Sequence, residues 1–129
     1  MLPVPPPQNV LLRLTEVGKT FQMGEVAVEV LKKITLDVMD GEFLVMVGPS
    51  GSGKTTMLNI MGGMDIVTRG HVWYRQQEMT NATPRELTRF RRESIGFVFQ
   101  FYNLVPNLTA KENVMVSTEI SRNPLPVEE

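Results

Sequence analysis

The chain has 129 residues, 42% of them hydrophobic, and a formal net charge of −1. This size and apolar content predict one globular domain rather than a disordered chain, and the near-neutral charge excludes an electrostatic nucleic-acid binder, which needs a basic surplus. The absence of cysteine excludes disulfides and thiolate metal sites. The longest apolar run is far below the roughly 20 residues that cross a bilayer, and no secretion signal is recognised. A cytoplasmic location is expected.

The first forty residues read as a tail followed by short extended elements. Four prolines within residues 1–10 predict a flexible or polyproline-type tail, because proline fits neither a helix interior nor a central strand. The patterns that follow predict a strand over 11–17, a loop over 18–24 that carries the single aromatic Phe21, an antiparallel pair formed by 26–31 and 34–39, and a turn at Asp40-Gly41.

The strongest signal lies in residues 43–56. Five apolar residues, predicted to form a strand, precede a glycine-rich loop of the form G-x-x-x-x-G-K-[ST], which ends at Lys54 and Thr55. Glycines allow the backbone N–H groups to approach a phosphate, and the following helix adds its positive N-terminal end. Lys54 would reach the β- and γ-phosphates, and the Thr55 hydroxyl would ligate Mg²⁺. The loop therefore predicts a nucleoside triphosphate site formed by Gly48, Pro49, Ser50, Gly51, Ser52, Gly53, Lys54, Thr55 and Thr56.

Two helical segments are predicted next. Met57, Ile60, Met61 and Met64 recur at helical spacing and predict an apolar face in the core, with the helix ending at Gly62-Gly63. Residues 71–74 predict a short strand on which His71 is a surface residue. Thr83-Pro84-Arg85-Glu86 is a capping box that predicts a helix to about Arg92. We interpret its arginines, Arg85, Arg89, Arg91 and Arg92, as a solvated face.

Residues 95–99 are apolar at every position, which predicts a strand buried on both sides of a parallel sheet. Gln100 follows at the carboxyl end of this strand, where ligands of open parallel sheets bind. A neutral amide there would hold Mg²⁺ or a water near the γ-phosphate, although such a residue is more often only a polar strand terminus. A second capping box, 109–112, predicts a helix to about Ile120.

Three segments together resemble the ATP-binding cassette (ABC) family, the ATPase subunits of membrane transporters: residues 48–56, 97–106 and 108–114. The resemblance runs from about Leu12 to the C-terminus. Residues 19–26 and 58–65 are most similar to the branch that serves lipoprotein release and macrolide efflux. The implied fold is α/β: a P-loop NTPase core with an N-terminal antiparallel β-subdomain and the start of the helical subdomain. A partial nucleotide-binding domain is expected over residues 11–129.

The resemblance also implies roles for individual positions. Gln100 would be the Q-loop glutamine, which senses Mg²⁺ and the attacking water, and Phe21 would stack on adenine, although the family usually has tyrosine there. Residues 101–109, Phe101 to Thr109, would face a transmembrane permease. ATP and Mg²⁺ would be the ligands, a second ABC ATPase subunit would complete a dimer, and the location would be the cytoplasmic face of a membrane.

The family's signature motif, its Walker B strand with the catalytic glutamate, and its switch histidine have no counterpart in this sequence. The chain therefore resembles the first half of a cassette and is expected to be inactive alone. Two alternatives stay open: another P-loop enzyme, such as a small-molecule kinase or GTPase, and a non-catalytic remnant that binds nucleotide weakly or only docks on a partner.

Overall fold

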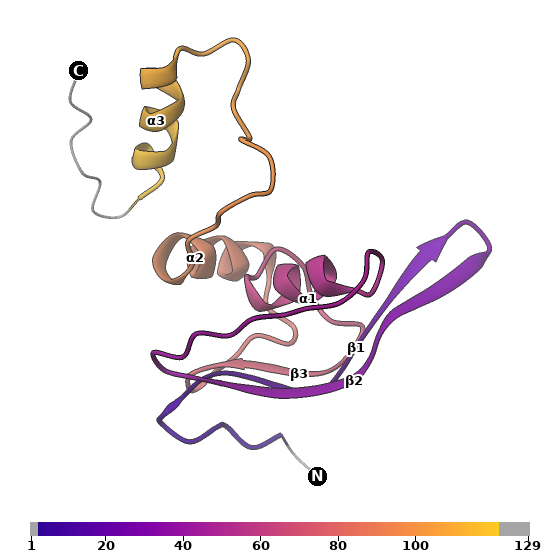
Figure 1. Cartoon of the computed structure of the whole chain (residues 1–129). Coiled ribbons are helices and arrows are strands. Elements are labelled where there is room, and N and C mark those ends of the chain that lie inside the picture. The colour runs from indigo at the N-terminus through magenta and orange to yellow at the C-terminus, as the bar shows by residue number, and fades with distance from the viewer. Residues whose placement is uncertain (1–2, 122–129) are drawn as a thin grey trace.

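The computed structural model describes residues 3–121, so residues 1–2 of the predicted tail and 122–129 of the predicted domain lie outside the described part. Its elements follow the order β1 (Val10–Met23), β2 (Val26–Met39), α1 (Lys54–Met61), β3 (Arg69–Tyr74), β4 (Gln77–Glu78), α2 (Pro84–Ser94) and α3 (Ala110–Glu119). Helices α1 and α2 lie on one face of the sheet, and a long connection carries α3 away from it (Figure 1). The predicted antiparallel subdomain is therefore present.

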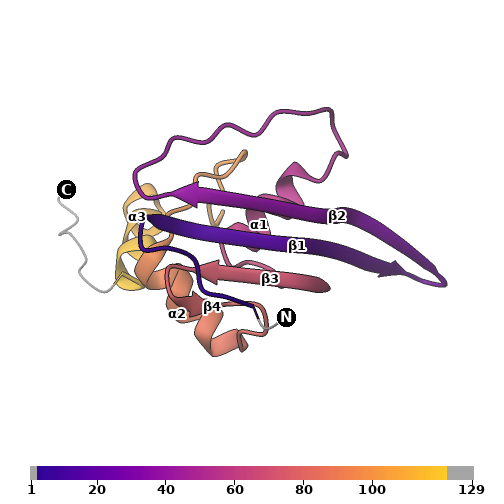
Figure 2. The same ribbon diagram turned by 90° about the horizontal axis from the view of Figure 1, so that it is seen from below.

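The sheet is antiparallel, with strand order β2-β1-β3-β4 (Figure 2). The predicted loop over 18–24 is wrong, because β1 continues to Met23 and turns back only at Gly24. The predicted pair 26–31 and 34–39 is wrong too, since both segments belong to the single strand β2, which pairs with β1. Lys33 has a φ of 49° in this strand, and β1 has register shifts of its own. Such bulges interrupt the alternation of side chains and mimic strand ends in the sequence.

The core lies between the sheet and the two helices. It combines apolar side chains of β1, β2 and β3 with Met57 and Ile60 of α1 and Phe90 of α2. The predicted apolar face of α1 is thus confirmed for these two residues and for the partly buried Met61, whereas Met64, beyond the end of the helix, is 48% exposed. This core holds α1 against the sheet.

The two glycines at the end of α1 form a junction between α1, α2 and the segment after α2. The predicted helix end is confirmed, because Gly62 is the C-terminal cap and Gly63 has a φ of 68°. A Cβ at Gly62 would lie 2.7 Å from Phe97 Cζ, and one at Gly63 would lie 2.6 Å from Phe90 Cδ1. Arg91 donates to the Gly63 carbonyl over 2.6 Å. Arg91 therefore does not belong to the solvated face predicted for α2, because it closes this junction.

Both predicted capping boxes are confirmed. In α2 the Glu86 side chain accepts from the Thr83 N–H over 2.7 Å, and the Thr83 hydroxyl accepts from the Glu86 N–H. The backbone N–H of Thr83 lowers the pKa of Glu86 because it stabilises the carboxylate. Thr109 and Glu112 repeat this arrangement at α3.

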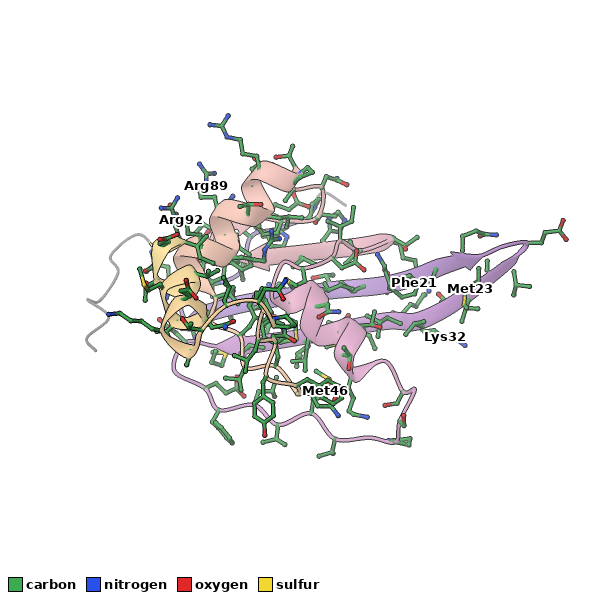
Figure 3. All side chains as sticks on the ribbon, turned by 90° about the horizontal axis from the view of Figure 1, so that it is seen from above. Phe21, Met23, Lys32, Met46, Arg89 and Arg92 are labelled. Atoms are coloured by element: carbon green, nitrogen blue, oxygen red, sulfur yellow. The ribbon has the colours of Figure 1, made fainter. Side chains whose placement is uncertain are left out.

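The two predicted apolar strands are not formed among residues 3–121. Residues 43–47 and 95–99 run as extended chain without ladder partners, and Phe43 and Val98 are almost fully exposed. Only Met46 (Figure 3) and Ile95 pack against the core. A strand needs a neighbour for its backbone groups, and no described strand pairs with either segment. The described part of the tail contacts the domain, since Pro6 is buried and its carbonyl accepts a hydrogen bond from Gln76, and the Asn9 carbonyl accepts one from the Asp40 N–H.

We expect Gly70→Ala to destabilise the domain strongly. Gly70, the second residue of β3, has a φ of 84°, and a Cβ there would lie 2.5 Å from the carbonyl oxygen of Glu16. The left-handed conformation costs roughly 1–2 kcal/mol, and the overlap with backbone adds about 1–3 kcal/mol. Urea unfolding followed by circular dichroism measures the loss. Gly24→Ala, where φ is 63° but no atom lies within 4 Å, isolates the conformational part. Equal losses in the two variants would contradict the clash.

Candidate functional site

The glycine-rich loop leads directly into α1. Gly51 and Gly53 have φ values of 77° and 93°, which residues with a Cβ rarely adopt. Gly53 is the N-terminal cap of α1 and offers no side chain to the first-turn N–H groups. These donors, together with the helix dipole, point out of the N-terminus toward the loop. The structure thus places an uncapped helix N-terminus directly after the loop, at the position that the motif predicts.

Lys54 lies over the loop rather than extending into solvent. Its Nζ donates to the carbonyl oxygens of Gly48 and Pro49, both at 2.6 Å, and lies 3.3 Å from Ser52 Oγ. The ammonium is therefore held at the centre of the loop by exposed acceptors. Phosphate oxygens carry negative charge and compete well against neutral carbonyls for such a donor.

The end of the loop packs on strand β2. A Cβ at Gly53 would lie 3.0 Å from Leu31 Cδ2 and 3.3 Å from both Val30 Cγ1 and the Val30 carbonyl oxygen. Leu31 is buried and lies opposite Lys19 in β1. Glycine is favoured at this point because φ is 93° and strand β2 approaches closely.

Phe21 lies two residues beyond Lys19, on the hairpin that extends past the rest of the sheet (Figure 3). It pairs with Val28 and is 38% exposed, so its ring is not a core residue. Register thus places Phe21 near the strand that supports Gly53. Phe21 therefore lies on the same hairpin whose strand β2 approaches the end of the loop at Gly53.

The remaining predicted residues are less closely linked. Thr55 is exposed in the first turn of α1, and Thr56 is half-buried beside it. An exposed hydroxyl at this place suits Mg²⁺, which usually takes one or two protein oxygens besides phosphate oxygens and water. Gln100 is exposed at the end of the extended segment 95–99. No hydrogen bond within residues 3–121 connects it to the loop.

Sequence reasoning missed the contacts of Lys19. This lysine is only 9% exposed and forms an ion pair with Asp65, with 2.7 Å between Nζ and Oδ1. A lysine and an aspartate 46 positions apart give no local pattern that predicts such a pair. His71, in contrast, lies on β3 as predicted and contacts Glu78 through Nδ1 over 2.8 Å.

The segment after Gln100 exposes large apolar side chains. Phe101, Tyr102 and Leu104 are 75%, 93% and 64% exposed. Asn113 of α3 fixes the second half of this segment, because it accepts from the Val105 N–H over 2.7 Å and donates to the Leu108 carbonyl over 3.1 Å. A hollow of about 860 Å³ lies between the segment and α3.

The described residues include no group of three or more metal-ligating acidic or histidine side chains, and no helix that could span a bilayer.

Comparisons with known proteins agree with this geometry. The ABC transporter family matches residues 31–128. An uncharacterized ABC transporter ATP-binding protein of Methanocaldococcus jannaschii, MJ0796, is 48% identical over 104 residues, which are 81% of this chain and 44% of that protein. The macrolide export ATP-binding/permease protein MacB of Brucella abortus is 48% identical over 106 residues, or 82% of this chain and 16% of that protein.

A solved structure of the MJ0796 cassette, a dimer in a post-hydrolysis state bound to ADP and Pi, superposes with a TM-score of 0.80 at 44% identity. The match covers 89% of this chain and 50% of that one. The chain thus spans about half the length of this cassette. Because the ABC transporter family matches residues 31–128, the chain is neither a small-molecule kinase nor a GTPase. The chain belongs to the ABC transporter family.

Proposed function

We propose that this chain binds Mg-ATP and forms the N-terminal part of an ABC transporter ATPase, which couples ATP hydrolysis to transport or extraction at a membrane. The observation that carries the proposal is the loop itself: two glycines with positive φ, an uncapped helix N-terminus and the Lys54 ammonium held over the loop. This arrangement supports phosphate binding by backbone N–H groups together with the Lys54 ammonium. The family's membership in transport complexes supports the wider role.

The site residues take the following proposed roles. Backbone N–H groups of residues 48–56 bind the phosphates, and Lys54 binds the β- and γ-phosphates. Thr55 and Gln100 contribute oxygen ligands to Mg²⁺, and Gln100 orients water near the γ-phosphate. Phe21 stacks on the adenine ring. Bound Mg²⁺ would neutralise charge on the phosphates.

The proposed partners are a permease and a second ATPase subunit. The exposed apolar side chains of residues 101–109, such as Phe101 and Leu104, support docking of a transmembrane partner there, since large apolar patches mark interaction sites. The dimeric MJ0796 structure supports pairing of two cassettes. The proposed place is the cytoplasmic face of a membrane. We also propose that residues 11–129 act as one partial nucleotide-binding domain, preceded by the tail 1–10.

Titration of the purified 129-residue chain tests the proposal. We expect ATP and tripolyphosphate to bind in the presence of Mg²⁺ and adenosine to bind at least a hundredfold more weakly than ATP, because the phosphates supply most of the contacts. The measurement is isothermal titration calorimetry. A chain that folds but binds neither ATP nor tripolyphosphate would refute the site and favour a remnant that only docks on a partner.

Phe21→Ala is expected to weaken ATP binding roughly fivefold to a hundredfold and to leave tripolyphosphate binding unchanged. Only the nucleotide has a base to stack on, and base–aromatic stacking is worth about 1–3 kcal/mol. The same calorimetry measures both ligands. Met23→Ala is the control, because Met23 is exposed on the same strand two residues further on (Figure 3). Equal weakening of both ligands would show that Phe21 only stabilises the hairpin.

A further inference from the structure

Lys19 is a charged side chain that the proposed nucleotide site does not use, although it is largely buried. Its Nζ donates to Asp65 Oδ1 and to the Ile66 carbonyl oxygen, each over 2.7 Å. The same Nζ lies 5.0 Å from the centroid of the Phe21 ring. The ammonium has three N–H groups, so these two acceptors leave its remaining side to the ring.

Contacts with two separate segments fix the position of the Lys19 ammonium. Asp65 and Ile66 belong to the connection between α1 and β3, whereas Lys19 and Phe21 belong to β1. Burying an ammonium is unfavourable unless it is paired and hydrogen-bonded, so Lys19 has little freedom to leave. A cation over the face of an aromatic ring attracts it through the ring quadrupole.

Strand β2 connects the Lys19–Phe21 pair to the glycine-rich loop. Lys19 lies opposite Leu31, whose side chain contacts the position of Gly53 at the start of α1. Phe21 is 38% exposed and lies near the end of the hairpin that β1 and β2 form. One face of the ring lies toward the ammonium, and the exposed part of the side chain remains accessible to a ligand.

We infer that Lys19 is a positioning residue, which holds the Phe21 ring in the orientation that receives the base of ATP. The inference rests on the proposed nucleotide site. Lys19 itself would touch neither the base nor the phosphates. The charge pair with Asp65 would thereby transmit the position of the segment after α1 to the base-stacking residue on β1.

A double-mutant cycle with two ligands tests the inference. The variants are Lys19→Met, Phe21→Ala and their combination, each titrated with ATP and with tripolyphosphate by calorimetry. Lys19→Met should weaken ATP roughly threefold to thirtyfold, the range of a part-buried cation–π contact, and leave tripolyphosphate unchanged. In the Phe21→Ala background, Lys19→Met should cause no further loss of ATP affinity.

Lys19→Met leaves the Asp65 carboxylate without its cation, which destabilises this single variant. Lys19→Met combined with Asp65→Asn removes both charges and should show the same selective loss of ATP, with a melting curve that confirms folding. Weakening of ATP and tripolyphosphate alike, or an equal ATP loss with and without Phe21, would overturn the inference and leave Lys19 a purely structural residue.

Failure of the underlying site gives different results. If the wild-type chain binds no tripolyphosphate, the phosphate site is wrong and the inference falls with it. If Phe21→Ala leaves the ratio of ATP to tripolyphosphate affinity unchanged, the stacking assignment is wrong, and the inference falls for that reason. If Phe21→Ala lowers this ratio but Lys19→Met does not, only the positioning role is refuted.

Discussion

Lys54→Ala is expected to reduce the affinity for Mg-ATP by about two to four orders of magnitude while leaving the fold intact. Hydrogen bonds to a charged group are worth roughly 1.5–3 kcal/mol each, and Lys54 would make two to the phosphates. The fold should tolerate the change because the present partners of the ammonium, the Gly48 and Pro49 carbonyls, lie in exposed residues that water can reach. Calorimetry gives the affinity, and a melting curve gives the stability.

Arg92→Ala provides the matched control for charge. Arg92 is exposed on α2, away from the loop (Figure 3), so its loss changes the net charge by the same amount. We expect it to leave ATP affinity within twofold of wild type, because exposed charges beyond a Debye length of about 8 Å are largely screened at physiological salt. Equal ATP affinities of wild type and Lys54→Ala would refute the assignment of the loop.

The 129-residue chain is expected to bind Mg-ATP without turning it over. Hydrolysis needs a water that is oriented and deprotonated, and a positioned general base contributes roughly 10²–10⁴-fold. No carboxylate within residues 3–121 hydrogen-bonds to the loop or to Lys54. The family resemblance implies that the base is a glutamate that follows an apolar strand. The sequence has no such glutamate.

Phosphate release under saturating Mg-ATP measures this expectation. The rate should equal that of a buffer blank, and Lys54→Ala should give the same rate. Steady release by the wild-type chain that disappears in Lys54→Ala would reveal a general base among the present residues. The chain would then be an active ATPase by itself, and the proposed division of labour with further residues would be wrong.

Local signals in the sequence predicted local structure well. The capping boxes at Thr83 and Thr109 define α2 and α3, because their hydrogen bonds connect residues three positions apart. The start of α1 at Lys54 and its end at Gly62 follow from backbone preferences of glycine. The loop motif was equally local, so its placement at a helix N-terminus was predictable.

Features that depend on distant partners were not predictable in the same way. Residues 43–47 and 95–99 have the composition of buried strands, but strand formation depends on a neighbouring strand, which composition does not supply. The bulge at Lys33 made one strand look like two. The Lys19–Asp65 ion pair joins residues that only the folded sheet brings together.

The junction at Gly62 gives α1 a second role besides carrying the loop. The helix has eight residues and is therefore about 12 Å long, with the loop and Lys54 at its start and the Phe97 ring against its last cap. Gln100 follows Phe97 by only three residues. Any side chain at Gly62 would displace the Phe97 ring and, with it, the segment that carries Gln100.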